Sequence, residues 1–292
     1  MYDRVLFPTD GSETASAVFD YVLAVASTHD ATVHGLHVAD TTDVSDTRSG
    51  ADVVDVLEQE GEDMVDEIAT RAEEAGVSVV TDVHRGDPAG KIVEYADEHD
   101  IDLLVMPTHG RSGLERYLLG SVTERVVNTA SSPVLTVTPS EGDEFVYPPQ
   151  NLLLPTDGSR CARVALDQAV DIADVTDAML HLLTVVETTT LGIDVRSTIV
   201  RDELEERATE ILDSATEAAE GASVDAVTRS LAYGRPYREI HSYITDNDID
   251  LVVLGTHGET DFSRYVLGGV SARLIRTSPV PVMLVPERGT DE

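Results

Sequence analysis

One stretch of this sequence, residues 103–122, occurs twice and constrains the fold more than any other. It reads LLVMPTHGRSGLERYLLGSV and returns as LVVLGTHGETDFSRYVLGGV over residues 251–270. Each copy ends an apolar strand with a glycine-spaced loop, and a helical pattern follows at once. The glycines are Gly110 and Gly120, then Gly258 and Gly268. Glycines at a strand end let backbone N–H groups approach a ligand, and a helix start offers unpaired donors with a partial positive charge. The loop therefore predicts a phosphate site, although its spacing matches neither the Walker loop nor the dinucleotide fingerprint.

The repeat runs through the whole chain and predicts two domains. Both halves open on an apolar strand followed by Pro-Thr-Asp-Gly-Ser, and the second opening lies 147 residues after the first. In each half, apolar runs alternate with helical patterns, which indicates a doubly wound (Rossmann-like), five-stranded parallel α/β sheet. We expect domains at residues 1–140 and 150–292, with a linker at 141–149 that contains two prolines. Ligands bind such sheets where the strand order reverses, so Asp10 and the glycine loop should face one crevice.

Local patterns predict several helix boundaries. Ser12 is the expected N-cap of the first helix, whose apolar residues recur at helical spacing. The polar stretch 40–52 lacks a period, so we expect a loop there, followed by a long helix over residues 53–75 that Gly76 ends. Pro88 is expected close to the first turn of the third helix.

The charge balance restricts the setting and the partners of the protein. Asp and Glu number 55 against 20 Lys and Arg, a net charge of -35. At about 1 M ionic strength the screening length falls to roughly 3 Å and the self-repulsion is quenched, so the composition predicts a halophilic protein. No basic stripe is present, which argues against nucleic acid and anionic membranes as partners. Without a signal pattern or an apolar run of roughly 20 residues, we expect a cytoplasmic location.

The isolated cysteine and the histidines have structural interpretations. Cys161, the sole cysteine, lies in a helical pattern typical of a small buried residue, and it cannot form an internal disulfide. His34 and His37 look like a metal pair, but an odd spacing on a strand sends them to opposite faces. His109 and His257 follow strands within tight turns, where a hydrogen-bonded support is a commoner role than a general base.

Several motifs together resemble the universal stress protein family. They are the glycine loop, the Pro-Thr-Asp-Gly-Ser openings, a Gly-x-Pro before the third helix of each half and a final Ser-Pro-Val strand. The likeness covers essentially the whole chain as two domains in tandem. It implies a stress-response or regulatory module that binds ATP with Mg²⁺. It also implies that the two halves pair through their last strands as an intramolecular pseudo-dimer, and it leaves a further homodimer open.

The resemblance implies a nucleotide site in each half. In the first half its positions are Pro8, Thr9, Asp10, Val38, Met106, His109, Gly110, Gly120, Ser121 and Val122. In the second half they are Pro155, Thr156, Asp157, Val185, Leu254, Gly255, His257, Gly258, Gly268, Gly269 and Val270. Asp10 would meet the ribose or the magnesium ion, and Val38 the adenine. The loop glycines would meet the phosphates, and Ser121 the terminal phosphate.

Both halves depart from the family pattern. Pro107 stands where the family has the first loop glycine, which removes a backbone donor. The second half keeps that glycine as Gly255 but has Gly269 in place of Ser121. It also has a carboxylate, Glu259, where the first half has an arginine, and a carboxylate repels phosphate unless a metal lies between them. These differences favour the first half as the better nucleotide site.

Alternatives stand beside these interpretations. Residues 121–124 have the pattern of a capping box, in which the Ser121 hydroxyl caps the helix. Asp10 has the position of a simple turn residue. For the whole protein the alternatives are a protein-interaction scaffold whose nucleotide sites have decayed, and a slow ATP hydrolase. No nucleophile or acid–base pair stands out, so no residue is assigned a catalytic role.

Overall fold

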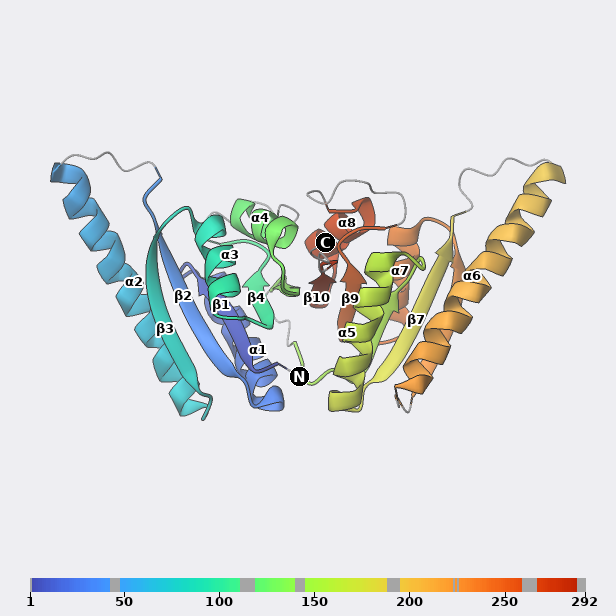
Figure 1. Ribbon diagram of the computed structural model, residues 1–292, viewed down its shortest axis with the longest axis horizontal. Coiled ribbons are helices and arrows are strands. Elements are labelled where there is room, and N and C mark those ends of the chain that lie inside the picture. Colours follow the sequence, from blue (N-terminus) through green and yellow to red (C-terminus); the bar gives the residue numbers. More distant parts are fainter. Residues whose placement is uncertain are drawn as a thin grey trace. The chain divides into compact units, whose positions relative to one another are not determined.

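The structure, a computed structural model, consists of two compact units, Met1–Tyr147 and Pro148–Glu292. It describes residues 2–42, 48–110, 119–139, 145–187, 195–222, 224, 226–258 and 267–287, without the side chains of 48–52 and 195–201. Each unit is an α/β domain with a parallel sheet (Figure 1), so the predicted fold class of two tandem domains is confirmed. Within the described ranges, no helix is long and apolar enough to cross a membrane.

Unit 1 alternates strands and helices along the chain. Its elements are β1 (Arg4–Thr9), α1 (Glu13–His29), β2 (Thr32–Asp40), α2 (Arg48–Glu74), β3 (Val79–Gly86), α3 (Pro88–Glu98), β4 (Leu103–Pro107), α4 (Ser121–Thr129) and β5 (Val134–Val137). The strands lie in the order β3-β2-β1-β4-β5, and all neighbours run parallel. Helices α1 and α2 pack together, with the Arg71 guanidinium of α2 4.8 Å from the ring centre of Phe19 on α1.

Strand β1 separates from β4 near the carboxyl edge of the sheet. It pairs with β2 from Arg4 to Thr9 but with β4 only at Val5 and Leu6. Beyond this point β4 continues beside β5 as far as Pro107. The strand order reverses at this place, so the carboxyl ends of β1 and β4 border the crevice that the sequence predicts.

Side-chain caps define the helix starts. Ser12 caps α1 as predicted, because its Oγ accepts the Ala15 N–H at 3.1 Å. Asp87 caps α3 in the same way, with Pro88 at the predicted position in the first turn.

The long helix α2 ends as predicted but begins earlier. It stops at Glu74, and Gly76 follows with a φ of 72°. The loop expected over 40–52 is wrong in part, because β2 reaches Asp40 and α2 starts at Arg48, while 43–47 lie outside the described residues. Val53 and Val56 are 46% and 57% exposed. These exposed valines do not form an apolar face, so the sequence has no apolar period that marks the start of the helix.

Unit 2 repeats this architecture. Its elements are β6 (Asn151–Pro155), α5 (Arg160–Thr176), β7 (Met179–Val186), α6 (Val195–Gly221), β8 (Val227–Tyr233), α7 (Pro236–Asp246), β9 (Leu251–Gly255), α8 (Gly269–Thr277) and β10 (Val282–Val285). The order β10-β9-β6-β7-β8 is again parallel, and β6 pairs with β9 only at Leu152 and Leu153. Cys161 is buried on α5, as predicted, and burial raises the pKa of its thiol.

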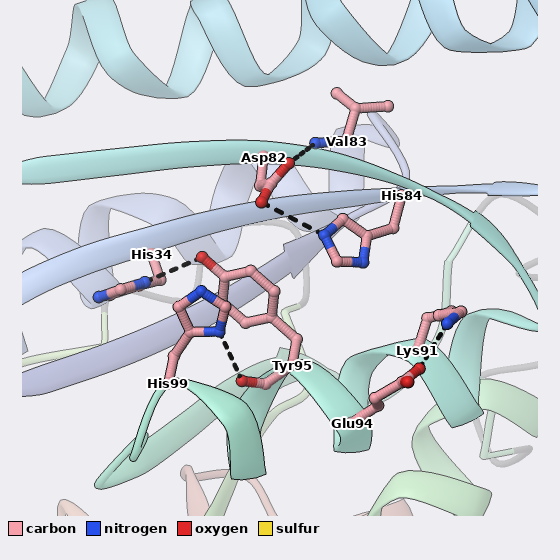
Figure 2. A network of polar contacts seen from close by, with 8 residues as sticks. All are labelled: His34, Asp82, Val83, His84, Lys91, Glu94, Tyr95 and His99. Atoms are coloured by element: carbon pink, nitrogen blue, oxygen red, sulfur yellow. Dashed lines mark hydrogen bonds and ion pairs between the residues drawn. The ribbon is translucent and has the colours of Figure 1, made fainter.

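The two histidines of β2 face opposite sides of the sheet, as their spacing predicts. His34 Nδ1 lies 3.0 Å from the hydroxyl of Tyr95 on α3 (Figure 2), whereas a Cβ on Gly61 of α2 would touch the His37 ring. Helices α2 and α3 therefore cover opposite faces. Tyr95 also stacks on His99 at 3.9 Å between ring centres. Among the described residues, no group of three or more His, Cys, Asp or Glu has the arrangement of a metal site.

Tyr147, at the end of unit 1, docks on the last turn of α1. Its hydroxyl lies 2.6 Å from Nε2 of His29, and the Tyr2 ring packs edge-on against the His29 ring at 4.7 Å. Burial raises the pKa of Tyr147 and lowers the pKa of His29 to about 4. The tyrosine therefore stays protonated and donates its hydrogen to a neutral imidazole.

This buried imidazole should make unit 1 sensitive to acid. Between pH 6.5 and 4 the unfolded chain binds a proton that the folded unit does not, so stability falls as the pH falls, by up to about 1 kcal/mol per pH unit. We expect His29→Thr, which copies Thr176 at the end of α5, to remove this contribution. Hydrogen exchange of α1 peptides at pH 7 and pH 5, corrected for intrinsic rates, measures it, and α5 peptides of the same chain are the control. An unchanged pH dependence of α1 protection in the variant would contradict the assignment.

Candidate functional site

A cavity of about 380 Å³ opens at the carboxyl edge of the unit 1 sheet. Elements β1, β2, α2, α3, β4 and α4 all contribute to its wall. The lining residues are Pro8, Thr9, Asp10, Leu36, His37, Val38, Ala39, Asp40, Leu57, Glu60, Met64, Pro88, Ile92, Met106, Pro107, Gly110, Gly120, Ser121, Val122 and Thr123. Every position predicted in the first half is among them except His109. The structure thus gathers residues from six separate stretches of sequence around one space.

The turn after β1 holds Asp10 at the mouth of the cavity. The Thr9 Oγ1 accepts the Gly11 N–H at 3.1 Å, and Asp10 Oδ1 accepts the Ser12 N–H at 3.0 Å. The other carboxylate oxygen lies toward Gly110, where a Cβ in place of the glycine hydrogen would come within 2.1 Å of Oδ2. Asp10 therefore has the turn contact that its sequence context suggests, and it also presents its carboxylate to the cavity wall.

The loop between β4 and α4 closes back on its own start. The Gly120 N–H donates to the Thr108 carbonyl at 2.7 Å, and the Thr123 hydroxyl donates to the Pro107 carbonyl at 3.0 Å. A Cβ on Gly120 would lie 3.3 Å from the Thr108 oxygen, so the close approach favours glycine. Residues 111–118, which include Arg111, the arginine at the position of Glu259, lie outside the described residues.

The capping-box interpretation of Ser121 is wrong. Gly120 is the N-cap of α4, and Ser121 is its first helical residue, with no side-chain cap hydrogen bond. The hydroxyl of Ser121 is exposed and lines the cavity. The first N–H groups of a helix have no partner within it, so α4 directs donors and the positive end of its dipole at this space.

The charge of the cavity wall is negative. Asp10, Asp40 and Glu60 line it, and no lysine or arginine is among the described lining residues. The nearest arginine on α4, Arg125, forms a two-pronged ion pair with Asp87 at 2.6 and 2.7 Å. That pair, with the Gly90 N–H, lowers the pKa of the Asp87 carboxyl. Within the described residues, positive potential for an anion therefore comes from the start of α4 rather than from a side chain.

His109 and His257 occupy the same supporting position in the two units. Nδ1 of His109 lies 3.1 Å from the Thr108 hydroxyl, and Nδ1 of His257 lies 2.8 Å from the Thr256 hydroxyl. His109 does not line the unit 1 cavity. Both rings contact the threonine that precedes them, which agrees with the support role that the sequence suggests.

Unit 2 keeps the backbone of this site. The Gly158 N–H donates to Thr156 Oγ1 at 3.2 Å, the Ser159 N–H to Asp157 Oδ1 at 2.9 Å, and the Gly268 N–H to the Thr256 carbonyl at 2.9 Å. Of the other predicted positions, Val185 lies on β7, Leu254 is buried on β9, Gly258 adjoins Asp157, and Val270 follows Gly269 in the first turn of α8. Glu259 lies outside the described residues.

The side chains of the unit 2 site differ. Gly269 starts α8 without a hydroxyl. A Cβ on Gly255 would lie 2.7 Å from the Cys161 Cβ and 2.8 Å from the Cys161 carbonyl carbon. The glycine at 255 is therefore required by the close packing of α5. The Cys161 thiol and the Arg160 guanidinium both contact Glu287, at 3.5 and 2.8 Å.

The α2 wall of the cavity was not predicted from the sequence. Leu57, Glu60 and Met64 recur at helical spacing and share one face of α2. Met64 also contacts the turn after β1, where a Cβ on Gly11 would lie 2.7 Å from its sulfur. The spacing of these three residues indicates that they share a face of the helix, but only the three-dimensional structure shows that this face lines the unit 1 cavity.

Unit 1 is a doubly wound α/β domain whose cavity lies where the strand order reverses, the place where sheets of this kind bind ligands. The chain belongs to the universal stress protein family, whose model matches residues 1–138 and 149–286. A universal stress protein of Methanocaldococcus jannaschii is 36% identical over 140 residues, covering 47% of this chain and 82% of that protein. One from Methanothermobacter thermautotrophicus is 34% identical over 135 residues, covering 44% and 91%. The crystal structure of a universal stress protein from Archaeoglobus fulgidus matches with a TM-score of 0.76 at 25% identity and covers 98% of both chains.

The contact between Gly110 and Asp10 should be sensitive to a single methyl group. We expect Gly110→Ala to cost about 1–2 kcal/mol of unfolding free energy, because its Cβ would lie 2.1 Å from a carboxylate oxygen that must move. Gly269→Ala is the matched control, since no atom lies within 4 Å of its Cβ and alanine favours a helix. Denaturant unfolding in constant high salt compares the two variants. Equal midpoints would show that the loop does not hold Asp10 as described.

Proposed function

We propose that unit 1 of this universal stress protein binds ATP with Mg²⁺, and that the protein acts in the cytoplasm as a nucleotide-dependent stress-response module. The observation that carries the proposal is the cavity at the reversal of strand order, which the N-terminus of α4 and Asp10 both border. A helix N-terminus next to a glycine loop suits phosphate.

The order of the elements gives the ligand a direction. Phosphates would lie at the start of α4 beside Gly120 and Ser121, and the ribose would lie at the end of β1 beside Asp10. The base would then lie over the end of β2, between Val38 and the apolar residues of the two flanking helices. Among the described lining residues these are Leu57 and Met64 on α2 and Ile92 on α3.

A divalent cation would complete the charge balance. Three carboxylates line the cavity, and a polyanion entering it would be repelled. Carboxylate oxygen is the ligand type that Mg²⁺ prefers, and Mg²⁺ is usually held by one or two carboxylates together with phosphate oxygens and water. The described residues offer no metal cage of their own, so the ion would arrive with the nucleotide and contact Asp10.

The proposal is binding rather than turnover. Among the described lining residues, no hydroxyl is hydrogen-bonded to a general base: the Thr123 hydroxyl bonds a carbonyl, and the His37 ring bonds the Thr9 carbonyl. The slow ATP hydrolase remains the alternative that a linear turnover assay would reveal.

Two observations favour a second role, as a protein-interaction scaffold, for unit 2. Its first loop glycine, Gly255, packs tightly against Cys161 of α5, and its helix α8 starts with Gly269 where α4 of unit 1 starts with the hydroxyl residue Ser121. Unit 2 would then keep the architecture of a nucleotide domain with a weaker site. Gly269→Ser, which restores the hydroxyl, tests how much affinity that position supplies.

Paired substitutions distinguish the two sites. We expect Asp10→Ala to weaken Mg-ATP binding about tenfold or more, since a charged partner of the ligand at the cavity wall would be lost. Asp157→Ala, the same change in unit 2, should alter the affinity less than about threefold. Isothermal titration in concentrated KCl, with and without MgCl₂, measures both, and about one ATP per chain is expected. Absence of binding by the wild-type protein would instead support the scaffold role.

A further inference from the structure

Helices α7 and α8 of unit 2, which pack against each other (Figure 1), carry positive charge in a chain that is strongly acidic. Segments 235–246 and 269–277 contain four arginines, against two acidic residues. The corresponding segments of unit 1, 87–98 and 121–129, contain five acidic residues against two basic ones. The positive charge therefore belongs to unit 2 alone. The arginines lie in two separate stretches of sequence, so only the fold brings them together.

Unit 1 shows that three positions of these segments converge. Asp87 at the start of α3 accepts the Gly90 N–H at 3.0 Å and pairs with Arg125 of α4 at 2.6 and 2.7 Å. The residues at the same three positions of unit 2 are Arg235, Arg238 and Arg273. Unit 2 thus has three arginines where unit 1 has a helix cap and a neutralised ion pair. We call these three residues the arginine patch.

The arginine patch has no ion pair with a carboxylate in the part of the chain that the structure describes. All three of its residues are exposed. Several other basic side chains do pair with carboxylates, namely Arg4, Arg71, Arg85, Lys91, Arg125, Arg160 and Arg229. With carboxylates in such excess over the whole chain, unpaired arginines are unexpected here. Their charges are available to a partner.

Arg235 is also an unfavourable residue for the helix that it starts. It is the N-cap of α7 and makes no side-chain cap hydrogen bond, whereas Asp87 caps α3. Aspartate is among the favoured caps, and a cation near a helix N-terminus opposes the helix dipole. A residue that breaks a local rule without a structural gain indicates a functional position.

The ring of Tyr237 holds one guanidinium of the arginine patch in place. The Arg273 guanidinium of α8 lies over this ring, 4.2 Å from its centre, and the Tyr237 hydroxyl lies 3.0 Å from Oγ1 of Thr277. Unit 1 has Ala89 at the position of the ring. A guanidinium stacked on an aromatic face keeps its edge N–H groups for two-pronged bonds to a planar anionic group such as a carboxylate.

The surroundings of the arginine patch decide which anionic partner fits. The end of α7 and the turn after it carry Asp246, Asp248 and Asp250, and the whole chain has a net charge of -35. A nucleic acid or an anionic membrane extends its charge well beyond three arginines and would meet this acidic surface. A short acidic segment of a protein can place its carboxylates on the arginines alone, a recurring mode of peptide recognition.

We propose that the arginine patch of unit 2 binds an acidic segment of a partner protein through guanidinium–carboxylate hydrogen bonds. The inference rests on the scaffold role proposed for unit 2, to which it adds the class of partner. It is independent of nucleotide binding by unit 1.

The test titrates the whole chain, without nucleotide and at constant KCl concentration, into a fluorescent octaglutamate peptide and its octaglutamine counterpart. We expect the glutamate peptide to bind at least about tenfold more tightly. Arg235→Asp copies Asp87 of unit 1, so it should cap α7 and pair with Arg273. The variant should therefore unfold at no lower temperature than the wild type and bind octaglutamate about tenfold or more weakly.

Arg163→Asp is the matched control. Arg163 is exposed in the first turn of α5, and the substitution changes the net charge by the same amount. Its affinity for octaglutamate should stay within about threefold of the wild type, because the general field of the chain changes but the arginine patch does not.

Equal binding of the two peptides by the wild type would overturn the inference, and so would undiminished binding by a folded Arg235→Asp variant. An equal loss in both variants would assign the effect to net charge and overturn it as well. Tighter binding of a single-stranded RNA octamer than of octaglutamate would overturn the partner class. None of these results bears on ATP binding by unit 1, and a failure of ATP binding would leave them unchanged.

Discussion

The candidate site depends on the separation of β1 from β4. The two strands pair at only two positions, Val5 with Leu103 and Leu6 with Leu104, while each continues beside its other neighbour. Had the pairing continued, the carboxyl ends would be closed by hydrogen bonds. Because it stops, the turn after β1 and the loop after β4 face the same space. They meet across Gly110, whose missing side chain leaves room for the Asp10 carboxylate.

The repeat within the chain separates what the architecture requires from what one site requires. Both units keep the hydrogen bond that closes the glycine loop, the turn after the first strand and the bond from the second strand to the first. They differ where side chains face the space beyond. His37 with Gly61 in unit 1 corresponds to Thr184 with Ala208 in unit 2. Since each pair satisfies the same carbonyl, packing alone does not explain the difference.

Much of this structure could be predicted from the sequence, for definite physical reasons. Parallel strands covered on both faces are continuous apolar runs, and the helices between them have apolar stripes, so the element order and the fold class follow. Ser12 and Gly76 mark helix ends through local chemistry that needs no tertiary contact. The start of α2 was not predicted because residues 48–52 have no apolar period in the sequence, and Val53 and Val56 in the turns that follow are exposed.

The candidate site was predictable only as far as its backbone. Glycine spacing identified the loop and the turn, but Ser121 matched a capping box because a pattern cannot show that the chain enters the helix one residue earlier, at Gly120. The contribution of α2 to the cavity wall could not be predicted for another reason. A helical face formed by Leu57, Glu60 and Met64 is the same in sequence whether it covers core, solvent or a cavity. Only the folded structure shows that this face lines the cavity.

The acidic composition and the site are connected through the placement of the few cations. Two basic side chains on helices that border the cavity are paired, Lys91 of α3 with Glu94 and Arg125 of α4 with Asp87, while the charged lining residues are acidic. Exposed pairs of this kind are weak and are screened further by salt. The backbone donors at the start of α4 lose less to screening, because they act at contact distance. A cation carried in by the ligand acts at the same range. The proposed recognition by backbone N–H groups and a carboxylate-bound ion thus suits a cavity wall whose described residues include no arginine.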